Sequence, residues 1–88
     1  MKKVYIFGKP TCPVCKDAHK KIKYFKEKKD FNAEIKYFDM ETVDGLAEGA
    51  YYEVDDVPTV IILDEKKEIA RWVKKPPISK EFLPYLEV

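Results

Sequence analysis

The chain has 88 residues, of which 45% are hydrophobic, and its 17 basic and 16 acidic side chains leave a net charge of +1. This length suits a single domain with one modest core, which we place at residues 1–88. A net charge close to zero gives no general attraction to nucleic acid or to a membrane surface. Apolar runs of about half a dozen residues are much shorter than the ~20 residues that cross a bilayer, and the run after Met1–Lys3 is too short for a signal peptide. We therefore expect a soluble cytoplasmic protein that binds neither nucleic acid nor membranes.

The first part of the chain predicts a strand, a helix and a second strand. Residues 4–7 form a short β-branched and aromatic run that is typical of a strand buried on both faces, and residues 8–11 are expected to form a turn. From Pro13 to about Lys28, apolar residues recur at helical spacing while lysines fill most other positions. The apolar face of this helix consists of Val14, Ala18, Ile22 and Phe25. The alternation in residues 35–38 predicts a second strand.

A second helix is expected between residues 46 and 54, where apolar side chains again follow helical spacing. Thr42 or Asp44 is suited to begin it, because both residue types accept hydrogen bonds from the first backbone N–H groups of a helix. Gly45 and Gly49 are expected to weaken the helix, which leaves its ends open.

The last part of the chain predicts a β-hairpin and a short helix. Residues 57–63 have the strongest strand pattern, residues 64–67 suit a hairpin turn, and residues 68–73 form the returning strand. Ser79 is placed to cap a final helix, in which Pro84 predicts a kink or an early end because it removes a backbone hydrogen bond. The element order is thus β-α-β-α-β-β-α. We expect the first helix to cross between two parallel strands and the last two strands to pair antiparallel.

Charge is distributed unevenly along the chain. Residues 16–29 contain seven lysines, whereas residues 39–56 contain seven acidic side chains and no lysine or arginine. The lysine-rich helix has no arginine and lacks the alternation of aromatic and basic residues that would stack nucleic-acid bases. We therefore interpret it as a solvated helix face.

The functional signal is the pair of cysteines in Thr11-Cys12-Pro13-Val14-Cys15, between a predicted strand and an amphipathic helix. Cys12 falls at the helix start, where free backbone N–H groups and the helix dipole stabilise a thiolate, which makes it the expected nucleophile. Cys15 lies one turn deeper and is better shielded, and its thiol can attack a mixed disulfide on Cys12. Pro13 suits the first helical turn because it has no N–H to satisfy.

Other interpretations of the cysteines remain open. They could be buried packing residues or a permanent structural disulfide, although such bridges are rare in the cytosol. Cys12, Cys15 and His19 also have a spacing found among metal ligands. A closed zinc site needs more ligands than these, and the chain has no other Cys or His. Because His19 precedes two lysines, we expect it on the exposed surface of the helix.

Val57-Pro58 is the second feature of interest. A proline at the mouth of a buried strand is a candidate for a cis peptide bond, and the upstream Cys-Pro-x-Cys motif strengthens this expectation. A cis bond would turn the backbone of Val57 outward. Its N–H and C=O would then be free to bind an extended cysteine-containing peptide as an added strand.

The chain resembles the thioredoxin superfamily, and within it the glutaredoxins and glutaredoxin-like small thioredoxins. The resemblance rests on residues 7–15, Phe-Gly-Lys-Pro-Thr-Cys-Pro-Val-Cys, and on Val57-Pro58-Thr59. The similarity in element order covers residues 2–87. It implies the thioredoxin fold, an α/β structure in which the four predicted strands form one mixed sheet flanked by the three predicted helices.

The resemblance also implies roles for individual residues. Cys12 matches the nucleophile, Cys15 the resolving thiol and Pro58 the cis proline. Lys9 matches the basic residue with which glutaredoxins bind the glycine carboxylate of glutathione. Val57 matches the residue whose backbone pairs with the cysteinyl part of that ligand. The other expected substrate contacts are Thr11, Pro13 and Val14.

Some stretches differ from these relatives. Glutaredoxins typically carry a Gly-Gly pair that docks the γ-glutamyl end of glutathione, but residues 71–77 contain no glycine. Thioredoxins usually have Trp-Cys-Gly-Pro-Cys, whereas Thr11 and Pro13-Val14 stand at the differing positions here. Ile6 stands where thioredoxins carry a buried acid.

The resemblance implies a dithiol oxidoreductase, an electron donor that reduces protein disulfides through Cys12, with Cys15 closing the exchange. It would act as a monomer without a bound cofactor or metal, and a reductase or glutathione would recharge it. Ribonucleotide reductase and peroxiredoxins are the kinds of protein substrate that the resemblance implies. The alternatives are a metal or iron–sulfur cluster carrier that uses the same two cysteines, and a binding module without redox activity.

Overall fold

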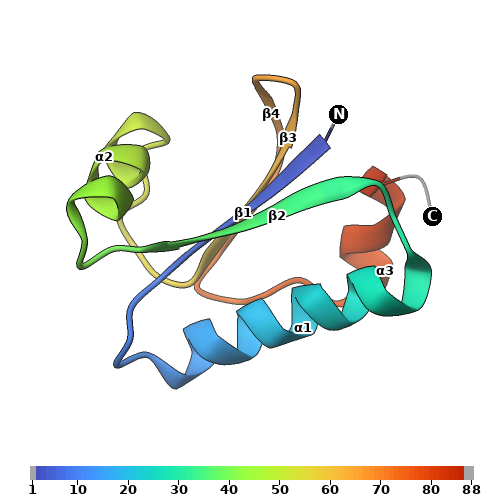
Figure 1. The fold of residues 1–88 in the computed structure, drawn as a ribbon, viewed down its shortest axis with the longest axis horizontal. Coiled ribbons are helices and arrows are strands. Elements are labelled where there is room, and N and C mark those ends of the chain that lie inside the picture. The colour runs from blue at the N-terminus through green and yellow to red at the C-terminus, as the bar shows by residue number, and fades with distance from the viewer. Residues whose placement is uncertain (1, 87–88) are drawn as a thin grey trace.

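A four-stranded sheet forms the centre of the computed structural model, which describes residues 2–86 (Figure 1). The predicted order of strands and helices, β-α-β-α-β-β-α, is confirmed, and a short 3₁₀ helix follows it. The elements are β1 (Lys2–Gly8), α1 (Pro13–Lys29), β2 (Ala33–Asp39), α2 (Val43–Tyr51), β3 (Thr59–Asp64), β4 (Lys67–Val73), α3 (Ser79–Phe82) and the 3₁₀ helix η1 (Leu83–Leu86).

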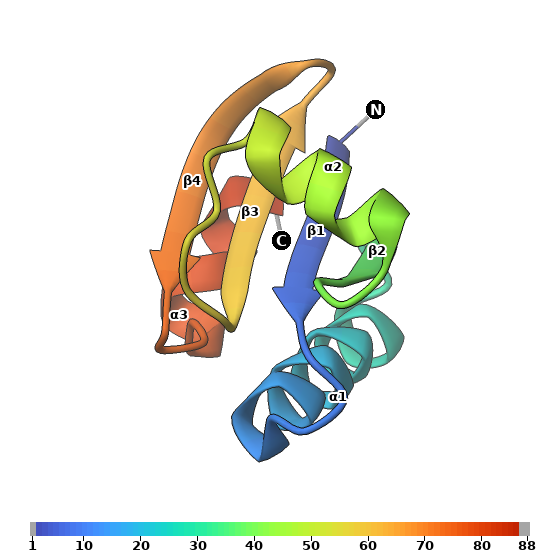
Figure 2. The same cartoon turned by 90° about the vertical axis from the view of Figure 1, so that its left-hand side faces the viewer.

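The strands lie side by side in the order β2-β1-β3-β4 (Figure 2). β1 and β2 pair in parallel, and α1 supplies the crossover connection that parallel neighbours require. β3 pairs antiparallel with both β1 and β4. The sheet is therefore mixed, as predicted. β1 lies in the interior of the sheet and leads directly to the segment that carries the cysteines.

α1 and α3 cover one face of the sheet (Figure 1), where the larger group of buried apolar side chains lies. α1 packs there through one face, as predicted, but the face begins with Cys15 and not with Val14. Val14 is 47% exposed, whereas Cys15 is fully buried. The reason is helical periodicity. Cys15 lies one turn before Ala18 and two turns before Ile22, on the same face of the helix.

α2 covers the opposite face of the sheet (Figure 1). The predicted helix is present, with Thr42 as its N-cap, but it ends at Tyr51, before the predicted end. Its buried residues are Gly45 and Gly49. Of the apolar residues whose spacing predicted this helix, Val54 is buried but lies beyond the end of the helix. The other four are exposed: Leu46, Ala47, Ala50 and Tyr51. The glycines that we expected to weaken the helix are thus the residues through which it contacts the rest of the protein.

The hairpin between β3 and β4 is tighter than predicted. Its turn is Glu65–Lys66, because Asp64 and Lys67 already pair across the two strands. At the other end, β3 begins at Thr59. Residues 57–58 therefore lie in the loop before the strand and not in the strand itself, which leaves them outside the sheet on the side of the cysteines.

The final helix begins at Ser79, so its cap lies one residue earlier than predicted. Ile78 is the N-cap in place of Ser79, because it is extended and its N–H donates a hydrogen bond to Glu81 Oε1 at 3.2 Å. The α-helix gives way to the 3₁₀ helix at Leu83, directly before Pro84. The predicted early end is confirmed, and its cause is the missing N–H of that proline.

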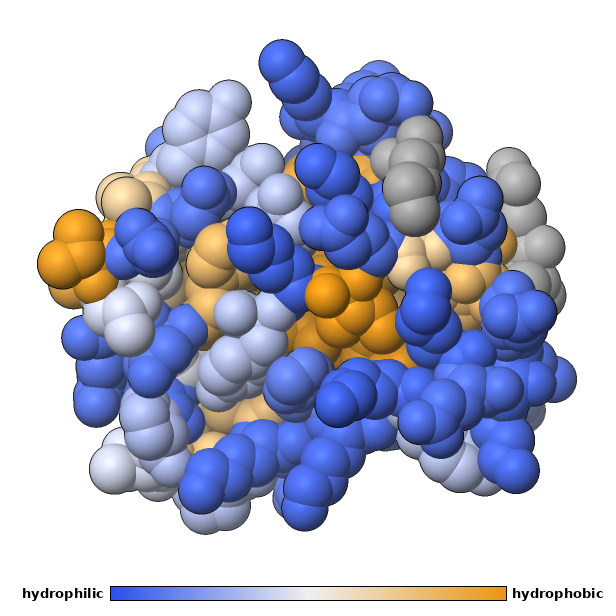
Figure 3. Space-filling model, viewed as in Figure 1, coloured by the Kyte–Doolittle hydropathy of each residue, from blue (hydrophilic) through white to orange (hydrophobic). Residues whose placement is uncertain are grey.

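Hydrophilic side chains cover most of the face seen in Figure 3, and apolar side chains appear near its centre and at its left edge. A groove between α1 and β2 is lined in part by Lys23, Lys26 and Ile35. Most lysines of α1 are exposed, in agreement with a solvated helix face. Among residues 2–86, no helix is long and apolar enough to cross a membrane.

Candidate active site

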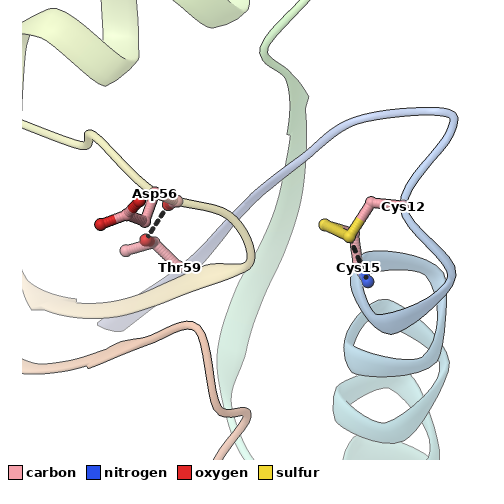
Figure 4. The surroundings of a disulfide bond; sticks show 4 residues. All are labelled: Cys12, Cys15, Asp56 and Thr59. Carbon is pink, nitrogen blue, oxygen red and sulfur yellow. Dashed lines mark hydrogen bonds between the residues drawn. A yellow bond between two sulfur atoms is a disulfide. The ribbon is translucent and has the colours of Figure 1, made fainter.

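Cys12 and Cys15 form a disulfide at the start of α1 (Figure 4). Their Cα atoms are 5.2 Å apart. Cys12 is the N-cap of the helix in an extended conformation, and Pro13 stands at the start of the helix. Cys15 follows within the first helical turn. The change from extended to helical backbone at this point is what brings the two sulfur atoms together.

The two cysteines differ in exposure. Cys12 is partly exposed, whereas Cys15 is fully buried beneath the start of the helix. A sulfur atom of another molecule can therefore approach Cys12 but not Cys15. This asymmetry is what a nucleophile and a shielded resolving thiol require.

The start of α1 provides a favourable environment for negative charge on Cys12. The backbone N–H of Cys15 donates a hydrogen bond to Cys12 Sγ over 3.1 Å. No acidic residue lies in the first turn of α1, and the exposed Lys16 follows the motif directly. When the disulfide is reduced, the same N–H group and the helix dipole stabilise a thiolate at Cys12.

The loop before β3 faces the cysteine pair (Figure 4). The peptide bond between Val57 and Pro58 in this loop is cis. The buried Thr59 closes the loop, because its hydroxyl donates a hydrogen bond to the Asp56 carbonyl over 2.6 Å. On the other side, the backbone N–H of Lys74 donates to the Pro58 carbonyl at 2.7 Å, and Lys74 Nζ lies 3.7 Å from Asp56 Oδ1. These contacts hold the loop between β3 and the end of β4.

The backbone of Val57 is available to a ligand. Within residues 2–86, neither its N–H nor its C=O takes part in a hydrogen bond. Its side chain is partly exposed, whereas Pro58 is buried. Neighbouring backbone groups are used by Thr59 and Lys74, whereas Val57, directly before the cis proline, keeps both its donor and its acceptor free.

The other residues expected to contact substrate lie in and before the motif. Lys9, Thr11, Pro13 and Val14 are all exposed. The backbone N–H of Cys12 donates to the Lys9 carbonyl over 3.1 Å, which closes the turn between β1 and α1. These residues therefore lie on either side of the partly exposed Cys12, on the segment that carries it.

Tyr37 lies close to Cys15, together with His19 and Gly8, and was not identified from the sequence. A Cβ atom at Gly8 would collide with Tyr37 Oη and would lie only 2.7 Å from Cys15 Cβ. The rings of His19 and Tyr37 stack at 4.7 Å with an interplanar angle of 18°. His19 is partly buried and not exposed as predicted, because the ring of Tyr37 on β2 stacks on its imidazole. Cys15 and His19 are four residues apart in a predicted helix, and this spacing could have placed His19 on the same side as the buried cysteine.

The environment of His19 makes folding stability dependent on pH. Burial lowers the pKa of His19 from its ordinary value of 6.5, and the nearby positive charge of Lys23 lowers it further. The unfolded chain therefore binds this proton at a higher pH than the folded protein does. As the pH falls through about 6.5, the free energy of unfolding is expected to decrease.

This prediction can be tested with His19→Phe, which keeps a ring against Tyr37 but cannot be protonated. Urea unfolding at about pH 7.5 and about pH 5.5 gives the pH-dependent change in the free energy of unfolding. The decrease toward low pH should be smaller in the variant than in the wild-type protein. Equal decreases in the two proteins would contradict the prediction.

The metal-binding alternative requires a group of ligands. Among residues 2–86, no three His, Cys, Asp or Glu side chains are grouped so that they could hold a metal ion. His19 packs on Tyr37 and does not complete a ligand set with Cys12 and Cys15. The donor set of a closed metal site is therefore not assembled in this part of the chain.

Comparisons with known proteins agree with this geometry. The family model described as Glutaredoxin-like domain (DUF836) matches residues 3–83. Among solved structures, thioredoxin 1 from the thermophilic eubacterium Thermosipho africanus is 33% identical, with 97% of this chain and 94% of that chain covered and a TM-score of 0.77. Thioredoxin-2 of a malaria parasite is 17% identical, with 99% and 82% covered and a TM-score of 0.82. Thioredoxin O2 from Arabidopsis thaliana is 16% identical, with 99% and 73% covered and a TM-score of 0.80. A comparison with curated proteins gives no match.

The fold and the site together define an α/β protein of the thioredoxin fold with a disulfide at the start of its first helix. The chain belongs to the glutaredoxin-like domain family, within the thioredoxin superfamily. The predicted fold class and the predicted resemblance are therefore confirmed. Fold and disulfide together support thiol–disulfide oxidoreductase chemistry in general terms.

Proposed function

We propose that this protein is a dithiol electron donor that reduces disulfide bonds in other proteins, with Cys12 as the nucleophile and Cys15 as the resolving thiol. The observation that carries the proposal is the disulfide between a partly exposed cysteine at a helix start and a fully buried cysteine one turn later. A structural bridge would need no such difference in exposure, whereas a two-step exchange depends on it.

The reaction has two steps that balance in sulfur bonds and electrons. The Cys12 thiolate attacks one sulfur of the substrate disulfide, and the other substrate sulfur leaves as a thiolate. Cys15 then loses its proton and attacks Cys12 Sγ, which breaks the mixed disulfide and releases the second substrate thiolate. Two electrons have moved to the substrate, and the Cys12–Cys15 disulfide is the oxidised product.

The free backbone groups of Val57 support binding of an extended substrate segment. A peptide that passes between the loop before β3 and the start of α1 can pair with both groups as a short added strand. Exposed Val14 and Thr11 are available beside such a segment. Because the pairing uses backbone atoms, it would accept many sequences around a substrate cysteine, as a general reductant requires.

Either a reductase or glutathione would restore the dithiol. The exposed Lys9 suits the glycine carboxylate of glutathione by charge. The segment after β4 has no glycine and carries the Lys74 contacts with the loop, so the γ-glutamyl site that the resemblance implies has no counterpart in sequence. The reduction potential distinguishes the two donors.

The test is an equilibrium titration in thiol–disulfide buffers of defined potential, with alkylation to trap the state and mass measurement to read it. We expect a reversible two-electron transition between about −200 and −280 mV. A value near the low end favours a reductase of the thioredoxin type, and one near the high end favours glutathione. Cysteines that never interconvert would overturn the proposal. Cysteines that resist alkylation until a chelator is added would support the metal or iron–sulfur carrier instead.

A further inference from the structure

The resolving cysteine lies in an apolar environment. Cys15 is fully buried, and so is Ile6, the residue that stands where thioredoxins carry an acid. Within residues 2–86, the only buried polar side chain is Thr59, whose hydroxyl is engaged by Asp56. Any side chain that donates a hydrogen bond to a thiolate at Cys15 must therefore be one that is only partly buried.

Tyr37 brings a hydroxyl group to this position. In the register of the sheet it pairs with Ile6, and Gly8 is the next residue of β1 on the same face. Without a side chain at Gly8, the space above its Cα is shared by Tyr37 Oη and Cys15 Cβ, and a single Cβ atom there would contact both. The tyrosine hydroxyl and Cβ of the resolving cysteine thus both lie beside Gly8.

The Tyr37 hydroxyl is held in place and is free to donate a hydrogen bond. The stacked His19 ring fixes the plane of the Tyr37 ring. Within residues 2–86, this hydroxyl makes no hydrogen bond while the cysteines are oxidised. Burial raises the pKa of Tyr37 above its ordinary value of 10.0, and the charge of Asp39 raises it further. The group therefore stays protonated at neutral pH and can act as a donor.

We propose that Tyr37 donates a hydrogen bond to the sulfur of Cys15 in the reduced protein and thereby stabilises the thiolate that carries out the resolving step. This inference rests on the proposed function and adds a residue to it. Cys15 gives its proton to solvent, its thiolate attacks Cys12 Sγ, and the bond from Cys12 to the substrate sulfur breaks with the electron pair leaving on the substrate. Tyr37 neither gains nor loses a proton in this step.

Tyr37 also lines a second pocket, next to Pro10. The other charged and titratable groups of this pocket are Lys16, His19, Lys20, Lys23 and Asp39. A substitution that removes only the tyrosine hydroxyl leaves all of these groups in place. Any change in the pH dependence of the resolving step can then be assigned to the hydroxyl itself.

Tyr37→Phe is the test, and Tyr24→Phe is the matched control, because Tyr24 lies on the exposed side of α1. Reduced protein is mixed with the aromatic disulfide 5,5′-dithiobis(2-nitrobenzoate), which releases one coloured thiolate when Cys12 reacts and a second when Cys15 resolves. We expect an unchanged first phase. The second phase should become about three- to tenfold slower at neutral pH, with its pH midpoint shifted upward, and the difference should vanish at high pH.

An equilibrium measurement supports the kinetic one. In a Cys12→Ser background, Cys15 is the only cysteine, and thiolate absorbance follows its ionisation. Tyr37→Phe should raise the midpoint of that titration, and Tyr24→Phe should not. The role of Tyr37 would be overturned if Tyr37→Phe matched the control in the rate and pH dependence of the second phase and in the titration midpoint. The proposed function would not be affected by that result. A wild-type protein that shows no two-phase reaction would overturn the proposed function itself, and this inference with it.

Discussion

Cys12→Ser is expected to abolish disulfide reduction, whereas Cys15→Ser should complete the first exchange and then stop. The reason is the difference in exposure, because only Cys12 can be reached by a substrate sulfur and only Cys15 can then release it. Loss of the nucleophile should lower the rate by more than about a thousandfold. The measurement is a single-turnover reaction of the pre-reduced protein with a disulfide-containing peptide, with no other thiol present.

The trapped intermediate provides the sharper evidence. Cys15→Ser should accumulate a mixed disulfide whose mass equals the protein plus one substrate chain, and dithiothreitol should release that chain. Cys12→Ser should form no such species under the same conditions. If Cys12→Ser trapped the substrate instead, the roles of the two cysteines would be reversed. If both variants kept normal turnover, the cysteines would not be the reacting groups.

The features that were predicted correctly depend on patterns within short stretches of sequence. The apolar spacing from Ala18 to Phe25 defines α1, and the β-branched run that ends at Leu63 defines β3. The placement of Cys12 at the start of α1 follows from a strand, a short turn and a proline in succession. Each of these signals is local, so the predicted positions of these elements depend little on tertiary packing.

The features that were missed depend on which residues meet across the sheet. Tyr37 reaches Cys15 only because β2 pairs in parallel with β1 in a register that sets it beside Ile6. A shift of one residue would turn the tyrosine to the opposite face. No local pattern specifies that register, and the role of Gly8 appears only when its neighbours are known.

The same limit explains why the sequence did not identify the buried side of α2. Helical spacing identified apolar side chains. Spacing alone does not show whether a helix packs through large apolar residues or through glycines. The turn at the end of β2 passes directly beneath α2, where the Thr42 hydroxyl donates to the Asp39 carbonyl over 2.7 Å. Gly45 lies over this carbonyl, so the closest approach of the helix falls on a glycine.

Gly45→Ala is therefore expected to destabilise the protein, although alanine favours a helix over glycine by about 1 kcal/mol. The new Cβ atom would collide with the backbone carbonyl of Asp39 and would lie 3.1 Å from Thr42 Oγ1. Backbone on both sides must then move, and overpacking of this kind costs about 1–3 kcal/mol. The collision is with a carbonyl that already accepts a hydrogen bond, so we expect the upper part of this range and a net loss of about 1–2 kcal/mol.

Gly49→Ala on the same helix separates the collision from helix propensity. Its Cβ atom would meet the end of the Met40 side chain, with Sδ at 2.9 Å, and this flexible side chain can move away. Both variants gain the same propensity, so the difference between their free energies of unfolding, measured in urea, isolates the contact with Asp39. Gly45→Ala should be less stable than Gly49→Ala by at least about 1 kcal/mol. Equal free energies of unfolding would mean that α2 can move away from the turn without loss of stability. Its glycines would then not determine how it packs.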